Sequence, residues 1–209
     1  MKKLGRLNIF ENMKEIVDPE HTALVIWDCQ NGLINNIFNK EEFLANLKGL
    51  LSAARERGVP IIYTRITPLP SEYRSSWNIY QGMLRFKVDD PTKIPVFMKS
   101  GSPEAEINAE VYPLEAELVI NKQSSSIFFG TNFDQLMRSR GIQTILFAGI
   151  ATEIGIEHSA REASIRGFYT VVVSDCVSSN DKAMHEMALK IMARLYLVDS
   201  SGDILNEWR

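Results

Sequence analysis

The 209-residue chain carries 23 basic and 26 acidic residues, and its formal net charge of −3 excludes the strongly basic surface on which nucleic-acid-binding proteins depend. Its longest apolar stretches, such as residues 23–27, are far shorter than the about 20 residues that cross a bilayer. Polar residues also follow the N-terminal lysines where a signal peptide would be apolar. We therefore expect a cytoplasmic protein with no nucleic-acid partner and no membrane partner.

Few residues of the chain could hold a metal ion or a disulfide framework. Cys29 and Cys176 are its two cysteines and form no CxxC pattern, and the histidines at positions 21, 158 and 185 lack the spacing of metal ligands. The glycine-rich GxGxxG and GxxxxGK[ST] motifs of nucleotide-binding loops are absent. We predict no metal and no cofactor, and we expect both thiols to be reduced.

Strand-like apolar runs alternate with helix-like segments through most of the chain. In chain order we expect a strand at 22–27, a helix at 40–57, strands at 59–64 and 118–121, a helix at 132–140, a strand at 143–148, a helix at 153–166, a strand at 169–174, a helix at 181–193 and a strand at 194–198. This alternation predicts βαβ units and an α/β fold with a mainly parallel sheet.

The alternation lapses between residues 66 and 117. This segment contains six prolines, at positions 68, 70, 91, 95, 103 and 113, and only residues 77–86 have a helical pattern. A segment this long and irregular is usually functional. We expect it to cover the substrate site and to contact another subunit of a homodimer or homotetramer. We assign residues 1–209 to a single domain, with an N-terminal arm at 1–20 and the irregular insertion at 66–117.

Polar side chains follow most of the expected strands. In open α/β sheets ligands bind beyond the carboxyl ends of the strands, so these residues are the first candidates for a site. They are Asp28, Gln30, Arg65, Lys122, Thr152, Glu153 and Asp175. On topology alone they could converge on one crevice.

Asp28 and Lys122 are the strongest of these candidates. Asp28 follows the run Ala-Leu-Val-Ile-Trp, where partial desolvation would raise its pKa. It could equally cap a loop or neighbouring backbone amides. Lys122 follows Leu-Val-Ile-Asn and could hold Asp28 ionised, bind an anionic substrate, or simply be a surface lysine at a strand end.

A third candidate is the turn before the helix at 153–166. Thr152 suits an N-cap position, and the backbone amides of such a turn can hold a carboxylate or a developing oxyanion. Gly155 stands in the first helical turn, where a glycine costs about 1 kcal/mol relative to alanine. Helix stability therefore does not account for it.

Four stretches together resemble the isochorismatase-like hydrolase superfamily. They are "ALVIWDCQNG" (23–32), "YTR" (63–65), "INKQSSSIFFGTNFDQLMRSRGIQTILFAGIATEIG" (120–155) and "REASIRGFYTVVVSDCVSS" (161–179), and the resemblance extends from about residue 22 to residue 198. It implies a Rossmann-like three-layer sandwich with a six-stranded sheet. The site that it implies combines an aspartate, a lysine and, in most members, a nucleophilic cysteine.

By motif the aspartate falls on Asp28, the lysine on Lys122 and the cysteine on Gly155. The resemblance also implies a cis peptide bond between residues 150 and 151, with the amides of Ala151 and Gly155 facing the ligand. The predicted substrate contacts are Gln30, Arg65, Phe128, Ala151 and Thr152.

Glycine at position 155 argues against covalent catalysis, because it supplies no nucleophile. Isochorismatases of the superfamily also carry glycine there, and in them the aspartate protonates a vinyl ether. The match to that branch is partial, because this chain reads Ala-Thr-Glu where they usually read Tyr-Ala-His. The nicotinamidase branch has histidines after its second strand, whereas this chain has none in "RITPLPSEYRSSW".

Three hypotheses follow from these residues. The first is a hydrolase without a cysteine nucleophile that acts on a vinyl ether or C–N bond of a small, anionic substrate, with Asp28 as general acid or base. The second is a binding or regulatory protein that has lost hydrolase activity. The third is a cysteine hydrolase in which Gly155 is an isolated substitution.

Overall fold

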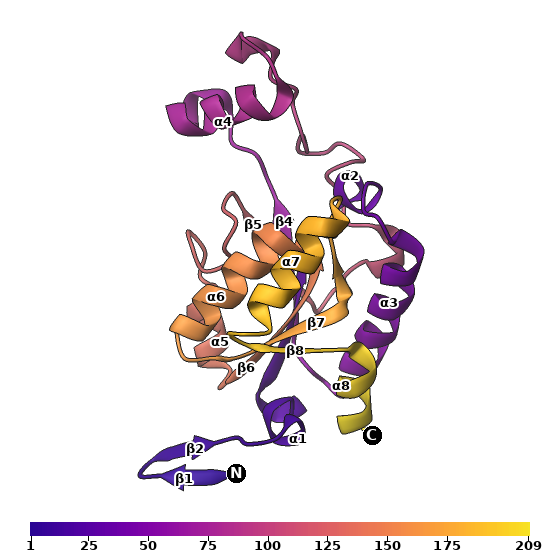
Figure 1. The fold of residues 1–209 in the computed structure, drawn as a ribbon, viewed down its shortest axis with the longest axis vertical. Coiled ribbons are helices and arrows are strands. Elements are labelled where there is room, and N and C mark those ends of the chain that lie inside the picture. Colours follow the sequence, from indigo (N-terminus) through magenta and orange to yellow (C-terminus); the bar gives the residue numbers. More distant parts are fainter.

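The computed structural model describes all 209 residues and is built around one six-stranded sheet (Figure 1). The strand order is β5-β4-β3-β6-β7-β8, and every adjacent pair is parallel. The strands are β3 (Thr22–Trp27), β4 (Ile61–Ile66), β5 (Leu118–Lys122), β6 (Thr144–Ile150), β7 (Tyr169–Ser178) and β8 (Leu197–Asp199). The predicted α/β fold with a six-stranded parallel sheet is confirmed.

Helices cover both faces of this sheet and create two apolar cores (Figure 1). One face packs against α3 (Lys40–Glu56) and α8 (Ser201–Glu207), and the other against α5 (Phe133–Ser139), α6 (Glu157–Ile165) and α7 (Lys182–Met192). All six residues of β3 are buried because this strand lies at the centre of the sheet with helices on both sides. The loop after β3 therefore starts from a fixed position.

Several boundaries differ from the predicted ones. Residues 59 and 60 precede β4 rather than belong to it, while β7 continues four residues beyond its predicted end at 174. The predicted helix at 153–166 divides into a π-turn (Thr152–Ile156) and α6.

Helix α8 was not predicted. The carboxylate of Asp175 accepts hydrogen bonds from Ser201 in its first turn, and Trp208 Nε1 donates to the carbonyl of Val17 at 2.7 Å. Such tertiary contacts leave no local sequence pattern.

Two segments project from the helix-covered sheet (Figure 1). Strands β1 (Lys2–Leu4) and β2 (Leu7–Ile9) form an N-terminal hairpin that was not predicted, followed by α1 (Met13–Ile16). Helix α4 (Ser76–Phe86) lies in the irregular insertion at the opposite end of the molecule, and none of its residues is buried. No helix of the structure combines the length and the hydrophobicity that crossing a membrane requires.

The returning part of the insertion, in contrast, is fixed to the loop after β3. The amides of Asn31 and Gly32 in α2 (Asn31–Ile34) donate to the carbonyls of Glu106 and Glu104, and the amide of Asn108 donates to the carbonyl of Cys29. This segment therefore packs beside the carboxyl end of β3, where Asp28 lies.

Candidate active site

Asp28 is the first residue after β3, and its backbone leaves the strand in the left-handed region with φ of 44°. Aspartate tolerates this conformation better than most residues. Its amide donates to Thr64 Oγ1 at 3.0 Å, and the same hydroxyl donates to Asp28 Oδ1 at 2.6 Å. The neighbouring strand β4 thus fixes the carboxylate from two directions, and only 4% of the residue is exposed.

Lys122, at the end of β5, completes a buried ion pair with Asp28. Its Nζ donates to Asp28 Oδ2 at 2.7 Å and to the carbonyl of Ser124 at 3.2 Å, and it lies 4.0 Å from the ring centroid of Trp27. Burial raises the pKa of Asp28 above its usual range against the opposing charge of Lys122, and burial also lowers the pKa of Lys122. The structure thus brings the two predicted catalytic side chains together.

Trp27 fills the space above Gly155. A Cβ atom on Gly155 would lie 1.9 Å from Trp27 Nε1 and 2.2 Å from Trp27 Cε2. Gly149 of β6 permits a similarly close approach, because a Cβ atom there would lie 2.2 Å from the carbonyl oxygen of Trp27. Gly155 is therefore explained by packing: the indole occupies the space that a side chain at position 155 would need.

This fit does not support the hypothesis of an isolated substitution at position 155. A cysteine at that position would collide with a tryptophan ring that is 2% exposed and held between β6 and Lys122. The two native cysteines do not replace it. Cys29 and Cys176 both lie in the core on the α3 face, where burial raises their thiol pKa well above the usual value.

The turn after β6 differs in part from the predicted one. The peptide bond between Ile150 and Ala151 is cis, as the resemblance implied. The N-cap is Ala151 rather than Thr152, whose hydroxyl lies 2.8 Å from His185 Nδ1. The Gly155 amide donates to the carbonyl of Ala151 at 3.1 Å, so it is not free to face a ligand. The Ala151 amide donates no hydrogen bond to the backbone.

The side chains of three predicted substrate contacts bond or pack against other parts of the protein. Gln30 holds the insertion, because its side chain bonds the backbone of Ile66 and donates to the carbonyl of Ala105 at 2.7 Å. Arg65 lies within β4, one residue after Thr64, and therefore points to the opposite face, where it donates to Asn121 Oδ1 at 2.9 Å. Phe128 packs against Phe133 and lies beneath the Arg166 guanidinium.

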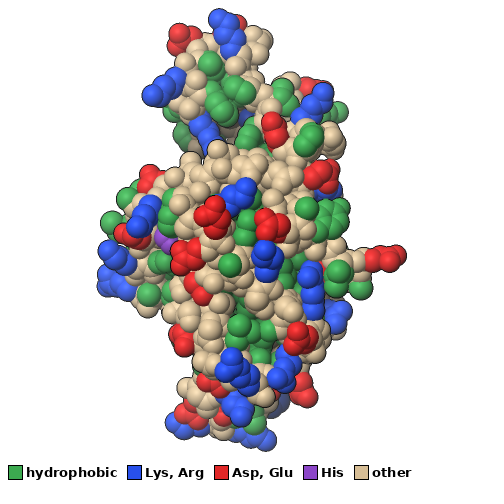
Figure 2. All heavy atoms as spheres, turned by 90° about the vertical axis from the view of Figure 1, so that its right-hand side faces the viewer, with side chains coloured by type: hydrophobic (Ala, Val, Ile, Leu, Met, Phe, Trp, Pro, Cys, Tyr) green, Lys and Arg blue, Asp and Glu red, His purple; other side chains and the backbone are tan.

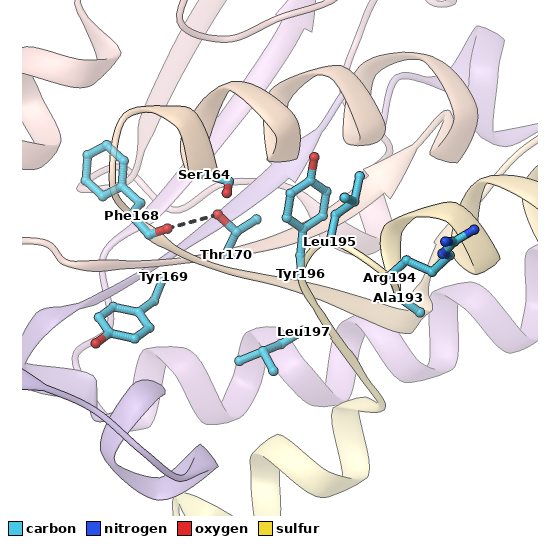
Figure 3. A pocket seen from close by; sticks show the side chains of 9 residues that line it. All are labelled: Ser164, Phe168, Tyr169, Thr170, Ala193, Arg194, Leu195, Tyr196 and Leu197. Atoms are coloured by element: carbon cyan, nitrogen blue, oxygen red, sulfur yellow. Dashed lines mark hydrogen bonds between the residues drawn. The ribbon is translucent and has the colours of Figure 1, made fainter.

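Two surface hollows lie away from this site. One, of about 420 Å³, lies between the start of β7 and the start of β8 (Figure 3). It is therefore at the amino ends of the strands, whereas Asp28 follows the carboxyl end of β3. Among its lining residues the Thr170 hydroxyl donates to the carbonyl of Phe168, and the Arg194 side chain points away from the hollow (Figure 3). The other, of about 240 Å³, is lined by residues that include Arg57, Arg140 and Pro60. No cluster of three His, Cys, Asp or Glu residues could hold a metal ion.

Sequence reasoning missed three residues of the site: Trp27, Thr64 and His185. Thr64 and His185 gave no signal of their own, because their partners come from other strands and helices. Trp27 could have been found, since strand pairing places it beside Gly149 and the predicted turn adds Gly155. A tryptophan that faces two glycines indicates that its ring fills the space their missing side chains leave.

Comparison with known proteins identifies the family of this chain. The isochorismatase domain model matches residues 22–201. YwoC of Bacillus subtilis, an uncharacterized isochorismatase family protein, is 29% identical over 84% of this chain and 87% of its own. The maleamate amidohydrolase of Pseudomonas putida is 32% identical over 75% of this chain and 67% of its own.

Solved structures show the same fold. An isochorismatase family protein from Burkholderia thailandensis superposes with a TM-score of 0.73 and 29% identity, over 90% of this chain and 96% of its own. A cysteine hydrolase from Pseudomonas syringae reaches a TM-score of 0.78 at 17% identity, over 92% of this chain and 94% of its own. The chain belongs to the isochorismatase family of hydrolases.

Proposed function

We propose that this protein hydrolyses a small, anionic substrate at a vinyl ether or C–N bond without a cysteine nucleophile, using Asp28 as general acid and base. The observation that carries the proposal is the buried Asp28–Lys122 pair beside a nucleophile position that Trp27 has filled. Relatives such as the maleamate amidohydrolase act on a C–N bond, which supports keeping that bond among the candidates.

Protonated Asp28 would begin the reaction on a vinyl ether. Its proton passes to the terminal vinyl carbon and leaves an oxocarbenium ion, while the Lys122 ammonium stabilises the new carboxylate. A water oxygen then bonds to the cationic carbon and returns a proton to Asp28. The resulting hemiketal separates into an alcohol and a carbonyl compound.

On a C–N bond, the ionised form of Asp28 would take a proton from water as the water oxygen adds to the carbonyl carbon. The same carboxyl group would then give that proton to the leaving nitrogen. Lys122 would hold Asp28 in place during both transfers, and no step requires a bond between substrate and protein.

A substrate screen tests the proposal. Purified protein is offered vinyl ethers, primary amides and ureides that carry a carboxylate, and product formation is followed by mass spectrometry. Turnover in one of these classes supports a hydrolase. Tight binding without turnover in any class would instead favour a non-catalytic binding protein, for which the filled space above Gly155 is the motivating observation.

Replacing Lys122 with Met is expected to move the pH profile of turnover on a vinyl ether toward higher pH. A general acid works only while protonated, so kcat/KM should fall as the pH rises through the pKa of Asp28. Burial raises that pKa and the Lys122 charge lowers it, so removal of the charge raises it further. Lys190→Met, on the exposed side of α7, is the matched control. A profile that stays in place or moves toward lower pH would contradict this electrostatic account.

We also propose that the protein assembles with further copies of itself into a homodimer or homotetramer. Helix α4 has no buried residue, and its exposed residues include large apolar ones: Trp77, Tyr80 and Leu84 are 61%, 51% and 59% exposed. Figure 2 shows hydrophobic side chains at the surface of the lobe at the top of the molecule. Exposed apolar groups gathered on a projecting segment are typical of a protein–protein contact.

The double variant Trp77→Asp/Tyr80→Asp should therefore disperse the assembly. Light scattering after size-exclusion chromatography is expected to give a multiple of 23.7 kDa for the wild type and about 23.7 kDa for the variant. Ile165→Asp on α6, where Ile165 is 80% exposed, is the control and should leave the mass unchanged. A wild-type protein that elutes at the mass of one chain would refute the assembly.

A further inference from the structure

The polar side chains around Asp28 are almost all satisfied within the protein. Both Asp28 carboxylate oxygens accept hydrogen bonds, from Thr64 and from Lys122. Lys122 has two oxygen acceptors and the face of an indole ring around its ammonium group. A substrate that reaches Asp28 therefore finds no free donor on Lys122.

The indole N–H of Trp27 is the exception. Trp27 as a whole is 2% exposed. Its Nε1 takes part in no hydrogen bond of the protein, and this atom is not among the fully enclosed polar atoms that lack a partner, so it retains contact with the outside. The other buried tryptophan, Trp208, donates to the carbonyl of Val17, whereas Trp77 is 61% exposed and can reach water. Because Nε1 is the accessible polar atom of an otherwise enclosed side chain, its acceptor can come from water or from a ligand that enters the site.

The position of this N–H relates it to the reaction. Nε1 is the Trp27 atom nearest to the site of a Cβ on Gly155, where relatives carry their nucleophile. The face of the ring contacts Lys122, and Trp27 directly precedes Asp28 in the chain. The donor therefore lies within the reaction site and is held there by β3, β6 and Lys122.

We propose that Trp27 is a substrate-binding residue whose indole N–H donates a hydrogen bond to a carboxylate oxygen of the substrate. A donor-only group selects an acceptor, and the anionic substrate of the proposed function, on which this inference rests, supplies one. The indole thus both excludes a side chain at position 155 and provides the polar contact at that place.

The three indole N–H signals of the ¹⁵N-labelled wild-type protein test this directly. Trp77→Phe and Trp208→Phe assign two signals, and the third belongs to Trp27. Titration with sodium formate, the smallest carboxylate, is expected to move the Trp27 signal in a saturable way and to leave the other two unchanged. Sodium chloride at equal ionic strength controls for salt, and acetamide tests a neutral carbonyl.

A Trp27 signal that stays still in formate, or that moves equally in chloride, would overturn the proposal. With a substrate from the screen, Trp27→Phe should raise KM about tenfold, the effect of one lost hydrogen bond, with a smaller change in kcat. Unchanged KM together with an inactive Asp28→Asn would reject the role of Trp27 and leave the proposed function intact. A saturable shift without any turnover would retain the binding role and reject the hydrolase.

Discussion

Asp28→Asn is expected to lower kcat about a thousandfold, within the range that loss of a general acid or base produces. Asparagine keeps the size of the side chain and can still accept from Thr64, but it cannot exchange a proton with substrate or water. Because the substitution removes the charge beside Lys122, it also leaves a buried ammonium without its partner. Steady-state kinetics and circular dichroism of the same preparation separate the two effects.

The double variant Asp28→Asn/Lys122→Met serves as the first control, since it removes both charges and should recover stability without recovering activity. Asp175→Asn is the matched control for a carboxylate that lies within strand β7. Asp175 bonds Ser201 at the start of α8, so its loss should weaken folding and leave kcat unchanged. Activity of Asp28→Asn near the wild-type level would remove Asp28 from the mechanism.

Gly155→Ala is expected to lower the free energy of unfolding by about 3 kcal/mol, at the upper end of the usual penalty for overpacking a core. The added methyl group would lie 1.9 Å from Trp27 Nε1, and the ring cannot move away because β6 and Lys122 enclose it. Urea unfolding measures the change. Gly49→Ala in α3 is the control: no atom lies within 4 Å of its added Cβ, so this change should be neutral or slightly stabilising.

The companion variant Trp27→Leu tests whether the two positions act together. Alone it opens a cavity and should destabilise the protein, but combined with Gly155→Ala it makes room for the new methyl group. We expect the double variant to be about 2 kcal/mol more stable than the sum of the single effects predicts. Additive effects would show that Trp27 does not determine which residue position 155 accepts.

Residues with a local signature were predictable from the sequence. Asp28 and Lys122 directly follow apolar runs, and the parallel arrangement of strands carries them to one edge of the sheet. Helix α3 agrees with the helix predicted at 40–57 to within one residue at its end. The general position of the candidate site followed from these two features.

Residues whose role depends on a neighbour in space were not predictable. Arg65 was assigned to the end of a strand, but β4 continues through it, and alternation then turns its side chain away from Asp28. Thr152 has the residue type of an N-cap, yet His185 of a distant helix takes its hydroxyl. The reason for Gly155 depends on Trp27, which lies 128 positions earlier in the chain, at the end of β3.

The activity of a cysteine-free protein tests the central claim most directly. The variant Cys29→Ala/Cys176→Ala removes both thiols from the chain, and turnover of a substrate found in the screen is compared with that of the wild type. We expect kcat within about twofold of the wild type, because each thiol is buried and neither belongs to the mechanism, which relies on general acid–base chemistry alone. A folded cysteine-free protein without activity would contradict hydrolysis by Asp28 and would indicate that a cysteine thiol is the nucleophile.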